Sequence, residues 1–309
     1  MDTLTQRFPE IADGEPLADG TADIGDRDTG KTLMQREREI ARRYMGDVPW
    51  FAVFWGLGNL AIWLALWPLV LFGYLPLWAA FPVATLNVIL CYLPSHEAQH
   101  DIIGRAGTRW RWLNELVGHL STIPLVLPYR AAKLTHLEHH RHTNHPERDP
   151  DYTMRADSPL HMIWVSLKNR QPRSNRGLRG YRDALVRIGR PDAALDGLLY
   201  QFAFYGILCG AAWAGFGIEA LLLWWLPRHI GTAYIQFFLS WAPHHPGTRQ
   251  GRYRNTRAWR SALGNIGSMG MQYHIVHHLH PTIPLTRTPA AYRELRPILE
   301  ARGCRLENL

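Results

Sequence analysis

The sequence predicts an all-α integral membrane protein, with four transmembrane helices in two hairpins and a helical cap on the cytoplasmic side. Three observations lead to this prediction. Two long apolar regions are each divided by a short turn, basic residues gather between those regions, and clusters of histidine follow them. Hydrophobic residues make up 47% of the chain, and its 13 Trp and 12 Tyr can supply the aromatic belts of a membrane protein.

The first hairpin is predicted from residues 48–95, a run that contains no charged side chain. A membrane span needs about 20 mostly apolar residues, so this run is long enough for two spans. We place the two spans near residues 50–72 and 75–94, with Gly73 and Tyr74 as the turn.

The second hairpin is predicted from the apolar region of residues 197–243, with spans near 197–216 and 220–243. Arg228 and His229 interrupt the fourth span. A charge in the middle of a span costs about 2.5–3.5 kcal/mol on insertion scales. We therefore expect Arg228 to face the interior of the bundle or to lie near the membrane interface.

The formal charge of +8 is concentrated in one segment, between Arg105 and Arg190, which separates spans two and three. The short loops within the hairpins contain no Arg or Lys. Because cytoplasmic loops carry the excess of basic residues, this segment is predicted to be cytoplasmic, together with both termini. In a bacterium the membrane would be the inner membrane. The charge is thus explained by topology, and no nucleic-acid partner is expected.

Outside the spans, residues 1–30 are rich in Asp and Gly and poor in apolar residues, which predicts a disordered cytoplasmic tail. Residues 31–309 form the predicted membrane domain. Within this domain, Ser158 and Pro159 precede an apolar stretch that ends at Leu167. This pattern predicts a helix that either lies at the membrane interface or is an ordinary surface helix.

Eight histidines form three clusters, HEAQH, HLEHH and HIVHH, and each cluster follows an apolar stretch. They are His96, His100, His136, His139, His140, His274, His277 and His278. Imidazoles at i, i+3 and i+4 share one face of a helix. Imidazole suits zinc, copper, iron and nickel, and eight ligands are too many for one tetrahedral ion. A single histidine is more often structural, but three such clusters predict two metal ions.

These motifs and their flanks resemble the membrane fatty acid desaturase superfamily, which includes acyl desaturases and related carotenoid hydroxylases and ketolases. HLEHHRHTNHPERDPD, from His136 to Asp151, is similar to the second histidine motif of the family. YHIVHHLHPTIP, from Tyr273 to Pro284, is similar to the third. The resemblance extends from about residue 50 to about residue 297.

The resemblance implies a di-iron site that uses O2, held by a cytoplasmic cap on a four-span scaffold. It also implies one more ligand near the end of the fourth span, where Trp241-Ala-Pro precedes His244 and His245. We favour His244. The resemblance gives no catalytic residue beyond the metal ligands. Ligating imidazoles normally donate their second N–H to an acceptor, and five acidic residues are placed to accept it. They are Glu97, Asp101, Glu138, Asp149 and Asp151.

The function that this resemblance implies is that of a fatty acid (acyl-lipid) desaturase. A carotenoid (β-carotene) hydroxylase or ketolase is the alternative, and the substrate is a lipid or carotenoid taken from the bilayer. A metal transporter is an alternative of another class. Transporters place their ligands near the bilayer midplane, whereas these motifs are predicted at the cytoplasmic ends of helices.

Electrons must reach such a site from outside this chain. The sequence contains no GxGxxG loop for a nucleotide and no cysteine set for an iron–sulfur cluster. We therefore expect an external electron donor, a ferredoxin-like or similar small protein with its reductase. The basic character of the cytoplasmic face suits an acidic redox partner.

Overall fold

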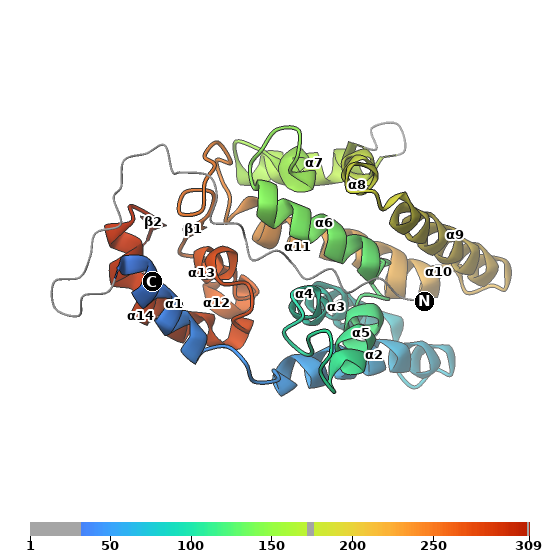
Figure 1. Ribbon diagram of the computed structural model, residues 1–309. Coiled ribbons are helices and arrows are strands. Elements are labelled where there is room, and N and C mark those ends of the chain that lie inside the picture. Colours follow the sequence, from blue (N-terminus) through green and yellow to red (C-terminus); the bar gives the residue numbers. More distant parts are fainter. Residues whose placement is uncertain (1–31, 172–175, 308) are drawn as a thin grey trace.

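The computed structural model describes residues 32–171, 176–307 and 309, and almost all of its regular structure is helical (Figure 1). The predicted disordered tail, residues 1–30, lies outside the described residues. Three helices are long and apolar enough to cross a membrane: Trp50–Leu71, Leu77–Gln99 and Pro191–Trp213. A mostly helical protein with three helices long and apolar enough to span a membrane is thus confirmed, while the arrangement of four spans in two hairpins stays a prediction.

The first two of these helices form an antiparallel pair. The pair consists of α2 (Trp50–Leu71), α3 (Leu77–Leu90) and α4 (Tyr92–Gln99), which continues α3 as one long helix. Two buried asparagines join α2 to α3, because Asn87 Nδ2 donates to Asn59 Oδ1 at 2.6 Å and Asn59 Nδ2 donates to the Asn87 carbonyl oxygen at 2.8 Å. Such polar contacts between helices satisfy groups that lipid cannot.

The second span is longer than predicted. We expected it to end near residue 94, but the helix continues to Gln99 and thereby includes His96. Polar side chains in this last part are buried against protein. Ser95 Oγ, for example, donates to the carbonyl oxygen of Gly118 at 2.9 Å. The prediction ended the span where the apolar run ends, whereas the helix continues through polar residues that are buried against protein.

The third long helix, α9 (Pro191–Trp213), leads into a region that is helical without a break. This region comprises α10 (Gly217–Ala220), the π-helical segment η2 (Leu221–Trp225), α11 (Leu226–Ile235) and the π-helical segment η3 (Gln236–Trp241). It extends from residue 217 to residue 241 and so contains most of the predicted fourth span, residues 220–243. It is not one of the three long apolar helices above, and its crossing of the membrane stays a prediction.

α11 packs closely against α3. A Cβ atom on Gly231 would lie 2.6 Å from Val88 Cγ1, so a glycine here allows the two helices to approach. Arg228 on the same helix is partly buried, and its Nε donates to the carbonyl oxygen of Leu125 at 3.1 Å. The guanidinium also lies 5.0 Å from the Phe204 ring. Arg228 therefore faces neighbouring helices, in agreement with the expectation for a charge in this segment.

The end of the molecule that carries the histidine motifs is built from shorter helices. They are α1 (Leu33–Arg43), α5 (Arg111–Ser121), α6 (Tyr129–His142), α7 (Pro159–Asn169), α8 (Arg176–Arg187), α12 (Gly264–Gly267), α13 (His274–Leu279) and α14 (Thr288–Ala301). Three short 3₁₀ segments accompany them: η1 (Pro150–Met154), η4 (Met271–Tyr273) and η5 (Leu285–Arg287). In Figure 1, α1, α13 and α14 lie together at the end away from the tips of α2 and α9.

One small element departs from the all-α prediction. Strands β1 (Arg257–Ala258) and β2 (Arg305–Leu306) pair in parallel, with Ala258 opposite Leu306. A two-residue strand is too short for the alternation of polar and apolar residues that indicates strands. The pair joins the C-terminal end of the chain to the loop before α12.

Candidate metal centre

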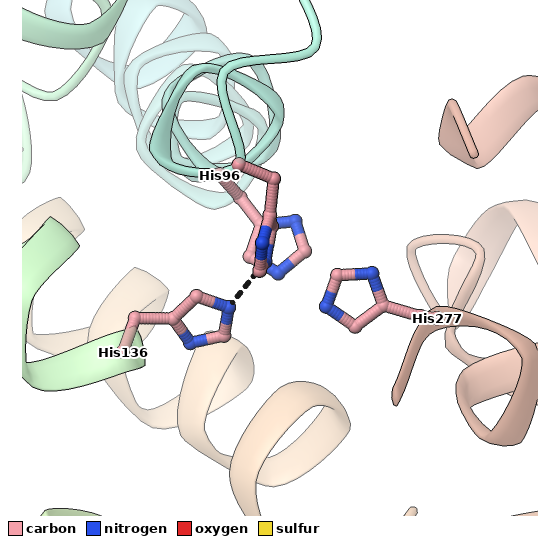
Figure 2. A group of neighbouring side chains, drawn as sticks. His96, His136 and His277 are labelled. Carbon is pink, nitrogen blue, oxygen red and sulfur yellow. Dashed lines mark hydrogen bonds between the residues drawn. The ribbon is translucent and has the colours of Figure 1, made fainter. Parts of the chain in front are cut away.

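All nine predicted ligands come together at one place, from four parts of the chain. His96 and His100 lie at the end of α4, and His244 follows η3. α6 carries His136, His139 and His140, and α13 carries His274, His277 and His278. Figure 2 shows the rings of three of them, His96, His136 and His277, pointing toward one another from α4, α6 and α13. The i, i+3, i+4 spacing thus does place the imidazoles on inward faces.

The nine side chains form two adjacent groups. The first histidine group consists of His96, His100, His136 and His277, and the second consists of His139, His244 and His278. Within each group, one nitrogen of every ring lies within 4.8 Å of the others. The two remaining histidines each join one group. His140 Nε2 lies 3.1 Å from both His136 Nε2 and His277 Nε2, and His274 Nε2 lies 3.1 Å from His244 Nε2.

The spacing of the nitrogens fits ligands that share an ion. His100 Nε2 and His136 Nε2 are 2.9 Å apart, and His139 Nε2 and His244 Nε2 are 3.3 Å apart. Two nitrogens bound at about 2.1 Å to one ion, at angles between 90° and the tetrahedral angle, are separated by about 3.0–3.4 Å. The two groups therefore have the dimensions of two neighbouring coordination sites.

In the second group, the Nδ1 atoms contact acceptors outside the cluster. His139 Nδ1 lies 2.8 Å from Asp149 Oδ1, and His244 Nδ1 lies 3.3 Å from the Asn255 carbonyl oxygen. His278 Nδ1 lies 3.4 Å from Thr143 Oγ1, and His274 Nδ1 lies 3.1 Å from Met271 Sδ. When Nδ1 is held from outside, Nε2 points inward with its lone pair free, as metal-ligating histidines require.

Asp149 is the strongest of these outer partners. Its Oδ1 accepts from the backbone N–H of Asp151 at 2.9 Å, and its Oδ2 accepts from that of Asn144 at 2.7 Å. Burial alone would lower the pKa of His139, but the charge and hydrogen bond of Asp149 raise it to about 9. Asp149 therefore makes His139 the most basic imidazole of its group.

The other imidazoles are held neutral. Burial, followed by the neighbouring histidines, holds the pKa of His136, His140, His274, His277 and His278 well below the ordinary value. Burial likewise lowers the pKa of His244 to about 3. Neutral imidazole is the form that binds metal, so these side chains are ready as ligands at neutral pH.

Unpartnered nitrogens support metal binding on physical grounds. Among the described residues, neither ring nitrogen of His96 has a hydrogen-bond partner, and His278 Nε2 has none. Each such buried polar atom costs about 1–3 kcal/mol unless something satisfies it. A metal ion would accept the lone pair of His278 Nε2 and that of one His96 nitrogen, while the other His96 nitrogen carries the proton. Imidazole suits iron, zinc, copper and nickel, so the donor set fits a transition metal.

Four of the five acidic residues that we considered as imidazole partners bond elsewhere. Glu97 accepts from the backbone N–H of Leu285, and Asp101 pairs with Arg111 and Lys133. Glu138 pairs with Arg141, and Asp151 accepts from Tyr181 and Ser240. Only Asp149 contacts a histidine of the two groups. The other four lie near the motifs in sequence, but their carboxylates bond to other groups.

The remaining histidines near the motifs lie outside the two groups. The ring of His245 lies 4.8 Å from that of Trp241, whereas the neighbouring His244 joins the second group, as expected. His280 Nε2 lies 3.0 Å from Glu37 Oε1. His145 Nδ1 accepts from the backbone N–H of Glu147.

Sequence reasoning missed some residues that hold this site. Asn144 is one: its φ is +66°, and its Nδ2 donates to the carbonyl oxygens of Arg249 at 2.7 Å and Asn255 at 2.8 Å. It thereby ties the second motif to the loop that also supports His244. The signal available in the sequence was Thr143-Asn144 within the second motif. Asparagine adopts a left-handed backbone conformation more readily than most residues.

A comparison with models of protein families identifies the family of this chain. The model of the family described as fatty acid desaturase matches residues 62–307, which include all nine histidines. The chain belongs to this desaturase family. Membership of this family accounts for the histidine motifs, for the residues that flank them and for the two histidine groups.

Individual relatives of this chain are distant. An sn-1 acyl-lipid omega-3 desaturase (ferredoxin) of Nostoc sp. (strain 36) is 24% identical over 232 residues, covering 68% of this chain and 62% of the relative. An sn-1 oleoyl-lipid 12-desaturase of Picosynechococcus sp. is 23% identical over 241 residues, covering 64% and 63%. An omega-3 fatty acid desaturase of Glycine max is 24% identical over 217 residues, covering 60% and 48%. The chain thus spans less than two thirds of the length of these relatives.

Proposed function

We propose that this protein is a membrane-bound, O2-dependent fatty acid desaturase that acts on acyl lipids. The observation that carries the proposal is the pair of adjacent histidine groups at the ends of long apolar helices. The family match supports it, as do relatives whose names specify acyl-lipid desaturation.

Each histidine group would hold one iron ion. His96, His100, His136, His140 and His277 would bind the first, and His139, His244, His274 and His278 the second. Two iron ions there would supply, with O2, the oxidant that removes hydrogen from an unactivated C–H bond. Five imidazoles around one ion exceed the four ligands that zinc takes in structural sites, which favours iron.

The protein's own residues would hold the ligands in place and keep the centre dry. Asp149 accepts the Nδ1 proton of His139, and the Asn255 carbonyl oxygen does the same for His244, so both rings keep their orientation. Every ligand except His136 and His140 is almost fully buried. Exclusion of water protects the substrate from side reactions.

Desaturation needs a supply of electrons. Formation of the C=C bond removes two hydrogen atoms from the acyl chain. O2 accepts these two hydrogen atoms together with two electrons and two protons, and it is released as two water molecules. The chain offers no redox motif of its own, so a ferredoxin-type donor with its reductase would deliver the electrons. The name of the Nostoc relative specifies ferredoxin. The basic segment between the spans would place donor docking and the metal centre on the cytoplasmic side.

A mass-spectrometric profile tests this function. The protein is expressed with a ferredoxin donor in cells that make β-carotene, beside His277→Ala and the surface variant His119→Ala, whose side chain is half exposed on α5. We expect new double bonds in acyl chains with the native protein and His119→Ala, and none with His277→Ala. Oxygenated carotenoids with unchanged acyl chains would overturn the proposal in favour of the carotenoid branch.

A further inference from the structure

α7 (Pro159–Asn169) exposes a row of large apolar side chains. The exposed fractions are 79% for Leu160, 61% for Trp164 and 42% each for Ile163 and Leu167. The helix is well anchored, because Ser158 caps its first turn and Met162 is fully buried. A fixed helix with an exposed apolar face that includes Trp is typical of an element lying in the membrane interface.

A pocket opens beside this helix, between α7 and η1, and holds about 420 Å³. We call it the α7 pocket. It is lined by Tyr152, Thr153, Arg155, His161, Trp164, Val165, Lys168 and Asn169. Its walls are tied together, because Asn169 Nδ2 donates to the carbonyl oxygen of Thr153 at 3.0 Å. The volume is within the usual range for small-molecule sites.

The pocket carries positive charge without matching carboxylates. Neither Arg155 nor Lys168 forms an ion pair with a carboxylate in the described part of the chain. The Arg155 guanidinium instead lies over the Tyr152 ring at 4.8 Å, and its Nη1 donates to the Tyr152 hydroxyl. The carboxylate of Asp157 lies 3.5 Å from His161 Nδ1 but is fully exposed. Two cations in one pocket favour an anionic ligand.

The pocket also adjoins the metal centre. Tyr152 and Arg155 line a second, smaller cavity as well, whose walls include His139 and His244. The α7 pocket and the cavity beside the second histidine group therefore share a wall formed by Tyr152 and Arg155.

We propose that the α7 pocket binds the phosphate of an anionic membrane phospholipid and so selects, by headgroup, the lipid whose acyl chain is desaturated. The proposal rests on the proposed function. Arginine and lysine are the side chains that bind phosphate, arginine through paired hydrogen bonds and lysine as a point charge. The apolar face of α7 and its Trp164 would lie at the depth of the headgroups, where the phosphate of a bilayer lipid is found.

The test uses the full-length protein in mixed micelles, with ferredoxin, its reductase and NADPH. Phosphatidylglycerol, phosphatidylcholine and a galactolipid with the same acyl chain are compared as substrates. We expect Arg155→Gln and Lys168→Gln each to raise KM for phosphatidylglycerol about tenfold, with kcat and galactolipid turnover unchanged. Arg182→Gln is the matched control, because it removes an exposed arginine on α8 that pairs only with Asp183. Equal KM changes for all lipids, or none, would overturn the proposal.

A second readout does not depend on activity. Native mass spectrometry of the detergent-solubilised protein should show phosphatidylglycerol retained by the native chain and by Arg182→Gln, and lost in Arg155→Gln. Excess inorganic phosphate should not displace the lipid, whose acyl chains add to its binding. Displacement by phosphate, or retention in Arg155→Gln, would contradict a headgroup site. If no lipid is desaturated, the proposed function is wrong. Lipid retention in native mass spectrometry would still show whether the α7 pocket binds a phospholipid.

Discussion

Asp149 connects the fold to the chemistry at the scale of single residues. It is buried, it receives two backbone N–H groups, and it holds Nδ1 of His139. Outer partners of this kind fix the orientation and basicity of a ligand, and their loss typically costs 10–100-fold in metal affinity. A carboxylate is the strongest such partner because it is charged.

Asp149→Asn should therefore lower iron affinity about 10–100-fold and lower activity with it. The amide can still accept a hydrogen bond, but it no longer provides the charge that raises the pKa of His139 to about 9. Iron retained after dialysis against a chelator measures the effect.

Glu138→Gln is the control, because Glu138 neighbours His139 in sequence but pairs with Arg141. It should retain iron as the native protein does. Equal iron loss in both variants would mean that Asp149→Asn lowers iron binding only by destabilising the fold.

Eight of the nine proposed ligands could be predicted from sequence because helical spacing puts them on common faces, and His244 could be predicted from the resemblance to the desaturase family. Their outer partners could not. The Asn255 carbonyl oxygen that meets His244 comes from a loop whose path depends on the whole fold. Asp101 shows the converse: it directly follows His100, but a left-handed backbone turn (φ +56°) directs it to Arg111 and Lys133.

At the scale of elements, α1 is anchored to the third motif by a buried carboxylate. Glu37 is fully buried, and its Oε1 lies 3.0 Å from His280 Nε2 and 3.2 Å from Arg252 Nη2. Its Oε2 accepts from the Tyr253 hydroxyl at 2.8 Å. This contact was not predicted, because nothing in the sequence pairs a glutamate of an N-terminal helix with a distant histidine.

Glu37→Gln should destabilise the protein by about 3 kcal/mol, because it removes the buried counter-charge of Arg252 and one oxygen acceptor of a buried hydrogen-bond network. Glu300→Gln is the control, since that carboxylate forms an exposed pair with Arg296 and its loss should change stability far less. Unfolding in detergent, followed by helical circular dichroism, measures both. Equal stability losses would contradict the role of Glu37.

The same contact predicts a pH dependence. Burial raises the pKa of Glu37, but the hydrogen bond and charge of His280, with Arg252, outweigh it and leave the pKa lowered. A carboxyl whose folded pKa lies below its unfolded value of about 4.3 stabilises above that pH and loses its contribution as the pH falls through the folded pKa. The stability difference between native protein and Glu37→Gln should persist from pH 7 to about 5 and shrink below about 4.

Helix boundaries were predictable only where a charge-free run marks them. The first span was placed to within one residue of α2, Trp50–Leu71. α9 instead begins at Pro191, before the predicted residue 197, because Asp192 and Asp196 in its first turns pair with Arg130. From sequence these two acids indicate a loop, and only their partner on α6 explains them as part of a helix.

At the scale of the whole molecule, segments far apart in the sequence close one site. α4 approaches it at the end of a long apolar helix, α6 and α13 cover it, and η3 leads His244 into it. α1 and α14 pack together behind α13, so both ends of the described chain support the third motif. This arrangement yields two ligand groups side by side.

The number and kind of metal ions per chain tests the central claim most directly. Purified protein, produced with iron and zinc both supplied, is analysed by elemental analysis and Mössbauer spectroscopy. The account predicts two iron ions per chain that are magnetically coupled, and loss of the coupled signal in His277→Ala. Zinc alone, a single iron, or two irons retained in His277→Ala would contradict it.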